Sequence, residues 1–404
     1  MRNFLFVAVS SLALVACGTN DADENTDTTT AQAEPADDWG YETYDADNLA
    51  DSMASNDDAY GMGDSVAGED QDIPDSEERP IMQAQVVLDR VGFGPGVIDG
   101  KMGMSTENAL KGFQEANDLD GTGKLDEATK TALSDWDSIP ATRVVTIPAN
   151  WGNIDYVEIP EDPEGKAALE SLGYQTLDER LAERFHTTVD VLKQLNPGGQ
   201  PAGMRTGDDG SGTDSNPPPT KRPGEGYFTA GQQIRVPNIG GDRIEKGAIE
   251  DRNWQRTLAS LGVGTDQPEV DRIVVSKAGK TLKAYQGEKL VALFTVSSGS
   301  SEFPLPLGEW DIVGEAYNPP YRYDPEVLGN DDKKNNVQML PPGPNSPVGV
   351  IWIDLSKEHY GIHGTPDPET IGRAQSSGCV RLTNWDAARL AGMVSQSTKV
   401  IFEA

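Results

Sequence analysis

The stretch that most constrains this chain is residues 18–78, which contain no Lys or Arg, many Asp and Glu, and few large apolar side chains. Such a segment cannot bury enough surface to offset the entropy lost on ordering. We therefore predict that residues 18–79 form a disordered acidic linker and that folded structure begins near residue 80. An acidic cation-binding tail is the alternative interpretation, although charge runs are usually only solvated.

The composition of the whole chain predicts several modest domains on flexible tethers. The chain has 404 residues, which leaves room for two or three domains, but only 36% of them are hydrophobic. Its 43 glycines and 27 prolines indicate generous linkers. The net charge of −33 argues against nucleic acid as a partner and against simple electrostatic attraction to an anionic membrane.

Residues 1–17 are typical of a secretory signal peptide, because Arg2 precedes an apolar run that is too short to span a bilayer. A short buried helix is the alternative, but the acidic stretch that follows offers nothing to pack on it. The closing "LVAC" resembles a bacterial lipobox, which implies that Cys17 is lipidated. Gly18 after this cysteine implies, by the same resemblance, a periplasmic protein anchored to the outer membrane. Cys379, the only other cysteine, would then be a free thiol outside the cytoplasm.

Residues 80–136 read as a small three-helix domain. Apolar residues recur at helical spacing in residues 81–91, Thr106 is expected to cap a second helix, and a third helix should end at Leu133. The order of glycines, Asp99-Gly100 and Phe113-Gln114 resembles the peptidoglycan-binding domain of cell-wall hydrolases. This resemblance implies affinity for peptidoglycan rather than catalysis. A helical spacer without a ligand is the alternative.

Residues 141–240 are predicted to form a small α+β unit. Residues 143–149 and 154–160 read as strands, two helices are broken at His186-Thr187, and "GQQIRVPN" closes the unit as a strand. This order is similar to the second half of a lysin motif, which implies binding to glycan. A Gly/Pro/Asp-rich insertion at residues 198–226 departs from that pattern. We expect His186 to be structural, because it lies beside an apolar face.

A connector at residues 241–267, with one helical segment, leads to a mostly β domain at residues 268–404. Apolar and polar residues alternate from residue 271 to 299, which predicts a meander with turns at Ala278-Gly279 and Gly287. Residues 317–347 are rich in Pro, Asn, Gly and Tyr and are expected to be irregular. Thr383 should cap one good helix, and "KVIFE" should be the last strand.

His363 is expected at the end of a strand, and Cys379, sixteen positions later, just before a helix. Imidazole is a common base for activating a thiol, and backbone N–H groups at Gly378 and Cys379 could stabilise an oxyanion. These are the parts that acyl transfer requires. A zinc site built from His359, His363 and Cys379 is disfavoured because no further clear ligand lies nearby. A merely buried cysteine is disfavoured by the polar, glycine-bordered "QSSGCVR" context.

"IHGT" followed by "SSGCVRL" resembles the catalytic signature of the bacterial L,D-transpeptidases, and the resemblance covers residues 270–404. It implies that Cys379 attacks the amide after the third residue of a stem peptide, and that His363 is general base and acid, oriented by the carbonyl of Gly364. The family most often has His where this chain has Ser377. The residues that the resemblance places at the substrate are Arg381, Ser377, Ser376 and Tyr321.

The sequence thus predicts a multidomain enzyme with a three-helix peptidoglycan-binding domain, a lysin-motif-like unit and a mostly β L,D-transpeptidase domain. It is expected to form cross-links in cell-wall biogenesis without a cofactor or metal, with peptidoglycan as its partner and a lipid anchor in the membrane. The alternatives are a non-enzymatic lipoprotein that tethers the membrane to the wall and an L,D-carboxypeptidase that uses the same dyad.

Overall fold

A computed structural model of the chain describes residues 73–204, 226–240, 244, 247–300, 303–325, 336–373 and 378–404. The predicted signal peptide, Cys17 and nearly all of the acidic linker lie outside these residues, as does most of the Gly/Pro-rich insertion. In the described part of the chain, no helix is long and apolar enough to cross a membrane.

The N-terminal helices form as the sequence predicts, with one correction. Their elements are α2 (Pro80–Arg90), β1 (Phe93–Gly94), α3 (Met104–Ala116), α4 (Glu127–Leu133) and the 3-10 turn Ser134–Trp136. Helix α3 begins at Met104 with Gly103 as its N-cap, so the prediction that Thr106 caps it is wrong. The hydroxyl of Thr106 is instead buried and accepts a hydrogen bond from the side-chain amide of Gln85 on α2, at 3.0 Å.

The middle unit combines a two-stranded antiparallel sheet, β2 (Thr142–Thr146) with β3 (Gln233–Pro237), and several short helices. These helices are α5 (Pro163–Ala167), α6 (Leu177–Arg184) and α7 (Val189–Leu195), with 3-10 turns at Ala149–Asn153 and Pro197–Gly199. The strand predicted at residues 154–160 is wrong, because that segment is not in a strand and pairs with no described strand.

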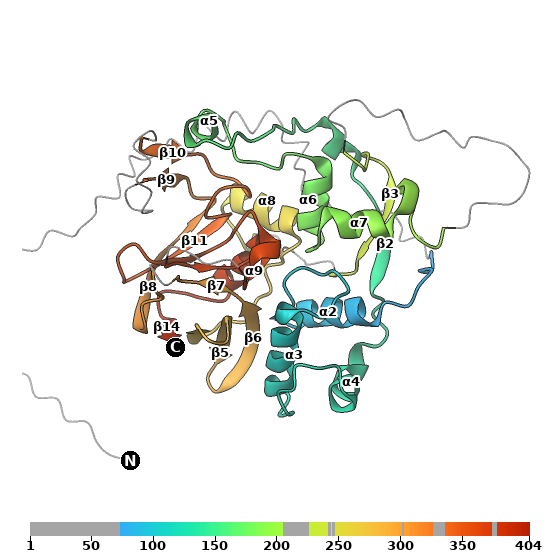
Figure 1. Ribbon diagram of the computed structural model, residues 1–404, viewed down its shortest axis with the longest axis horizontal. Helices are drawn as coiled ribbons and strands as arrows, with labels where there is room; N and C mark the ends of the chain where they lie inside the picture. The colour runs from blue at the N-terminus through green and yellow to red at the C-terminus, as the bar shows by residue number, and fades with distance from the viewer. Residues whose placement is uncertain are drawn as a thin grey trace, which may run out of the picture. The chain divides into compact units, whose positions relative to one another are not determined.

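The C-terminal part is mostly β, as predicted. After α8 (Arg252–Leu261), nine strands join β1 in one ten-stranded sheet of order β1-β6-β5-β4-β14-β8-β11-β12-β13-β7. Helix α9 (Asn384–Ala391) packs on β11 and β12, and Figure 1 shows α9 beside β11. Thr383 caps α9 by accepting from the Asp386 N–H at 3.1 Å, as expected. Besides β1, the strands of this sheet are β4 (Arg272–Ser276), β5 (Thr281–Gln286), β6 (Lys289–Thr295), β7 (Ser297–Ser298), β8 (Gly308–Tyr317), β11 (Ile351–Leu355), β12 (Gly361–His363), β13 (Val380–Arg381) and β14 (Lys399–Glu403).

The segment at residues 317–347 is more regular than predicted. It contains an antiparallel hairpin of β9 (Tyr321–Tyr323) and β10 (Gln338–Leu340), and residues 326–335 between them lie outside the described part. Tyrosines at both ends of β9 favour a strand, a signal that the abundance of Pro, Asn and Gly obscured.

The described units pack directly against one another, and are not joined only by the flexible tethers that the composition predicts. Strand β1 of the N-terminal helical unit pairs in parallel with β6, with Phe93 opposite Leu293. Phe93 and Leu293 also share one apolar cluster with the helices, and Met82 of α2 belongs to the core of the middle unit. These contacts are long-range, so hydrophobic spacing along the sequence did not reveal them.

Candidate active site

The register of two strands brings the predicted catalytic residues to one side of the sheet. Strand β12 runs parallel to β13, with His363 opposite Arg381. Cys379 stands two positions before Arg381, and residues two apart on a strand point the same way. Although Cys379 immediately precedes β13, this register directs its side chain to the face that carries His363 and Arg381.

His363 is held in one tautomer. Its Nδ1–H donates to the carbonyl of Gly364 at 2.7 Å, so Nε2 carries the lone pair and is the nitrogen free to accept a proton. The ring is 4% exposed, and the indole of Trp352 stacks on it with 5.4 Å between centroids and 19° between planes. Burial, with the charge of Arg381 added, lowers the pKa of His363 to about 3, so the imidazole is neutral at neutral pH.

Cys379 is half-buried beside the start of β12. Its Sγ lies 3.8 Å from the carbonyl oxygen of His359. Burial raises the pKa of the thiol, although a hydrogen bond from the backbone of Gly361 and the charge of Arg381 act in the opposite direction. The resting pair is therefore a neutral thiol and a neutral imidazole rather than a preformed ion pair.

Two glycines allow the close approaches around the thiol. Gly378 has φ +108°, which L side chains rarely adopt, and a Cβ there would stand 2.7 Å from the ring of Tyr360. A Cβ on Gly361 would stand 2.5 Å from the indole of Trp352. Any larger residue at position 361 would therefore push Trp352 off the imidazole.

Two of the residues predicted to contact the substrate lie near the thiol. Burial raises the pKa of Tyr321, and the negative charge that Cys379 can carry raises it further while Arg381 lowers it, so all three groups interact. The Nε of Arg381 is buried and has no hydrogen-bond partner among the described residues. Ser376 and Ser377 lie outside the described part of the chain.

The sequence analysis did not predict that Trp352 and Asp354 belong to this site. In β11, Trp352 lies opposite His363 and Asp354 lies opposite Gly361, so both share the catalytic face. The indole Nε1–H donates to Asp354 Oδ1 at 3.2 Å. The alternation in "VGVIWIDL" already places both side chains on one face, and only the partner strand was unknown.

Comparisons with known proteins now identify the family to which this domain belongs. Residues 270–402 match the L,D-transpeptidase catalytic domain. The "Putative L,D-transpeptidase YkuD" of Bacillus licheniformis is 36% identical over 222 residues, which are 55% of this chain and 90% of that protein. The chain belongs to the L,D-transpeptidase family. It is thus a cysteine-dependent acyltransferase that acts on peptidoglycan outside the cytoplasm. A second relative, the "Putative L,D-transpeptidase in ATP synthase subunits region ORF 5" of Fuscovulum blasticum, is 42% identical over 36% of this chain and 73% of its own length.

Residues 78–133 of this L,D-transpeptidase match the "Putative peptidoglycan binding domain" family, which confirms the N-terminal peptidoglycan-binding domain. Among solved structures, the L,D-transpeptidase from Mycobacterium smegmatis is 21% identical with a TM-score of 0.28, and the match covers 34% of this chain and 59% of that one. The catalytic domain from the E. faecium L,D-transpeptidase is 21% identical with a TM-score of 0.26, and the match covers 33% of this chain and 97% of that one.

The other two histidines of this L,D-transpeptidase lie in different surroundings. His359 is exposed, and its Nε2 is 3.4 Å from Glu358. Among the described residues, no three His, Cys, Asp or Glu side chains gather to hold a metal ion. His186 is fully buried, with Nδ1 3.2 Å from Asp89 and Nε2 2.9 Å from the carbonyl of Leu261, which agrees with the structural role expected for it.

Proposed function

We propose that this L,D-transpeptidase cross-links peptidoglycan through a thioester on Cys379. The thiol attacks the amide after the third residue of a donor stem peptide and passes its proton to Nε2 of His363. Nε2 then gives that proton to the departing amine of the terminal residue. An amine on a second stem attacks the thioester, which restores the thiol and forms the cross-link. The observation that carries the proposal is the hydrogen bond to the Gly364 carbonyl, which leaves Nε2 as the proton acceptor.

The neutral resting pair supports a concerted order of events. Because both the thiol and the imidazole are uncharged at neutral pH, the proton leaves sulfur as the sulfur attacks. The negative charge then develops on the carbonyl oxygen of the substrate. The backbone N–H groups of Gly378 and Cys379 are the proposed donors to this oxygen, and the left-handed φ of Gly378 supports their approach to it.

Arg381 is the proposed partner of a substrate carboxylate. Its Nε is buried without a partner among the described residues, and an unpaired buried donor is costly unless a ligand completes it. The planar guanidinium suits a bidentate carboxylate. Tyr321, which interacts with both Cys379 and Arg381, is proposed to line the donor site. Ser376 and Ser377 are proposed to contribute polar contacts from the segment that leads to the thiol.

Mass spectrometry of the purified protein tests the assignment. With a tetrapeptide-bearing muropeptide or a carbapenem, we expect an adduct on Cys379 that is absent from Cys379→Ala. His363→Ala should lose nearly all turnover, whereas the matched control His359→Ala should retain most of it. Muropeptide profiling then separates a cross-linked product from a hydrolysed one. Wild-type protein without an adduct from either reagent would favour a non-enzymatic tether, and hydrolysis alone would favour a carboxypeptidase.

The remaining domain assignments are also proposals. Residues 141–240 are proposed to be a lysin-motif-like glycan-binding unit. The support is that two helices with threonine caps, α6 and α7, follow α5 in the chain between the paired strands β2 and β3. The similarity to the B. licheniformis protein supports a shared region beyond the catalytic domain, because it is longer than residues 270–402. Loss of binding to purified glycan strands on deletion of this unit is the expected result, and unchanged binding would contradict the assignment.

The N-terminal 17 residues are proposed to be a lipoprotein signal peptide, with Cys17 lipidated and the protein held at the outer membrane. The apolar run before Cys17 and the acidic linker after it support this arrangement. We expect Cys17→Ser to release the protein from the membrane fraction. If the variant stays in that fraction, the lipobox assignment is wrong.

A further inference from the structure

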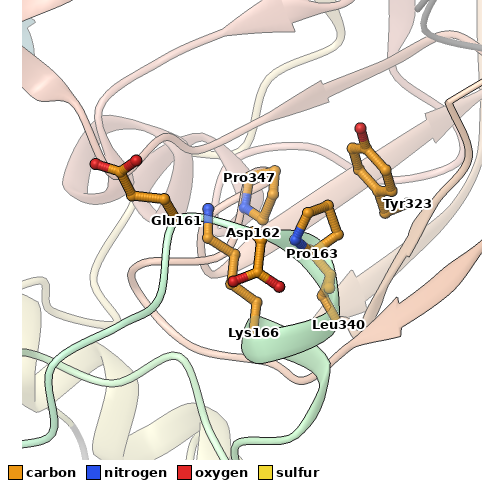
Figure 2. Close-up of a pocket in the computed structure, with 7 residues that line it drawn as sticks. All are labelled: Glu161, Asp162, Pro163, Lys166, Tyr323, Leu340 and Pro347. Atoms are coloured by element: carbon orange, nitrogen blue, oxygen red, sulfur yellow. The ribbon is translucent and has the colours of Figure 1, made fainter. Parts of the chain in front are cut away.

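A pocket of about 390 Å³ lies between the middle unit and the β9–β10 hairpin of the catalytic domain. Glu161, Asp162 and Lys166 line it from the segment around α5, and Tyr323 and Leu340 line it from the hairpin. Figure 2 shows Lys166 and Tyr323 on opposite sides of this pocket, with Pro163 and Leu340 between them. None of the catalytic residues described above lines the pocket.

The hairpin connects this pocket to the reacting thiol. Tyr321 lies opposite Leu340 in the β9–β10 register, and Tyr323 stands two positions after Tyr321 on the same strand. All three side chains therefore share one face of the hairpin, with about 7 Å between successive same-face positions along the strand. Tyr321 interacts with Cys379.

Hydrogen bonds hold the middle unit against the chain that follows β10. The Leu172 N–H donates to the carbonyl of Pro342, and the Asn345 N–H donates to the carbonyl of Leu172, both at 2.9 Å. The Asn345 side-chain amide donates to the carbonyl of Gly173 at 2.8 Å and to Glu179 at 2.6 Å. The wall of the pocket that comes from the middle unit is therefore fixed to the catalytic domain.

The pocket is lined by positively and negatively charged side chains and by apolar surface. Lys166 is the only cation among the described residues that line it, and the Nζ of Lys166 makes no hydrogen bond or ion pair with any residue that the structure describes. One carboxylate oxygen of Asp162 already has a hydrogen-bond partner, because Oδ1 accepts from the Gly165 N–H at 2.8 Å. Pro163, Leu340 and the ring of Tyr323 supply apolar surface. The volume is at the lower end of that found in small-ligand sites.

We propose that this pocket is the subsite for the acceptor stem peptide, with Lys166 binding an acceptor carboxylate. This inference rests on the proposed function. The donor carboxylate is assigned to Arg381, so the second peptide needs a cation elsewhere, and Lys166 provides one in this pocket. The carboxylates of Glu161 and Asp162 disfavour a dianionic ligand and favour a peptide that carries an amine as well. The acceptor amine reaches back past Tyr321 to the thioester, transfers a proton to His363 and forms the new amide as the thiol leaves.

The test separates acylation from transfer. In Lys166→Ala we expect the rate of mass addition to Cys379 from a donor muropeptide to be unchanged. The apparent KM for a tripeptide acceptor should rise about 5- to 10-fold, and a larger share of the thioester should be hydrolysed. Lys166→Arg should restore most of the acceptor binding. The matched control is Lys289→Ala, which removes an exposed lysine at the start of β6, away from this pocket.

A modified acceptor makes the test specific for the contact. Amidation of the acceptor carboxylate should weaken binding to wild type and abolish the difference between wild type and Lys166→Ala. An unchanged acceptor KM in Lys166→Ala, or equal use of the amidated acceptor by wild type, would overturn the subsite. Failure of wild type to acquire any donor mass would instead overturn the enzymatic function on which the subsite rests.

Discussion

The perturbation whose effect the structure predicts most directly is Asp89→Ala. Asp89 of α2 lies in the peptidoglycan-binding domain, and its side chain is fully buried. Both oxygens accept hydrogen bonds from Arg389 of α9, at 2.8 and 2.9 Å, and Oδ1 also lies 3.2 Å from the Nδ1 of His186 in the middle unit. One carboxylate thus joins the three folded units.

The expected cost follows from the charge that the substitution leaves behind. Arg389 is only 4% exposed, so Asp89→Ala removes the carboxylate that accepts two hydrogen bonds from a buried guanidinium. Removal of one member of a buried ion pair typically costs about 3–5 kcal/mol of stability. Asp89→Ala combined with Arg389→Met removes both charges and should recover most of that loss. The neutral double variant distinguishes the orphaned charge from the loss of packing.

Urea unfolding of wild type and variants, followed by circular dichroism, measures this free energy. The exposed ion pair between Lys130 and Glu127 is the matched control, and Glu127→Ala should leave the transition unchanged. Loss of less than about 1 kcal/mol in Asp89→Ala would refute the reasoning, because a pair that solvent reaches would not be costly to break. An Asp89→Ala/Arg389→Met variant no more stable than Asp89→Ala would equally refute it.

The same ion pair has a defined pH dependence. Burial alone would raise the pKa of Asp89, but Arg389 and His186 outweigh burial and hold that pKa below its usual range. The stabilisation is therefore present above the pKa of an unfolded Asp, about 3.9, and is lost as pH falls through the lower folded value. The contribution of this ion pair, measured as the difference between wild type and Asp89→Ala, should shrink as pH falls below 4.

Three further predictions concern single residues. Burial raises the pKa of Asp386 to about 7, so the folded state keeps a proton that the unfolded state loses, and stability falls as pH rises from about 4 to 7. Asp386→Asn should flatten that profile and be more stable than wild type by up to about 4 kcal/mol at pH 8, and parallel profiles would contradict this. Gly361→Ala should displace Trp352 and slow acylation about 10- to 100-fold, while the control Gly314→Ala, whose Cβ meets nothing within 4 Å, should leave it unchanged. Alkylation of Cys379 by iodoacetamide should accelerate about tenfold per pH unit from pH 7 to 9, because burial raises the thiol pKa, and an inflection between pH 4 and 7 would contradict the neutral pair.

Local signals predicted the elements well where the pattern was long and the partner nearby. The helix at α2 and the meander from β4 to β6 follow from apolar spacing and turn residues. The two wrong predictions, the strand at residues 154–160 and the cap at Thr106, share one cause: each depends on a distant part of the chain. Residues 154–160 alternate like a strand, but no described strand is available to pair with them, and a strand is stable only when its backbone groups have partners. Thr106 reads as a helix cap in sequence, but a buried amide from another helix takes its hydroxyl.

Short runs of the sequence were enough to predict the family of this protein and its N-terminal domain. The His363 and Cys379 motifs identified the family, and the glycine and Phe-Gln pattern identified the peptidoglycan-binding domain, because these signals lie within short runs of chain. The tertiary structure alone decided which side chains surround them. Trp352 lies over the imidazole through pairing of β11 with β12, and the pocket beside Lys166 exists because the middle unit packs on the β9–β10 hairpin. Both depend on contacts between distant segments, which become favourable only when the whole chain has folded.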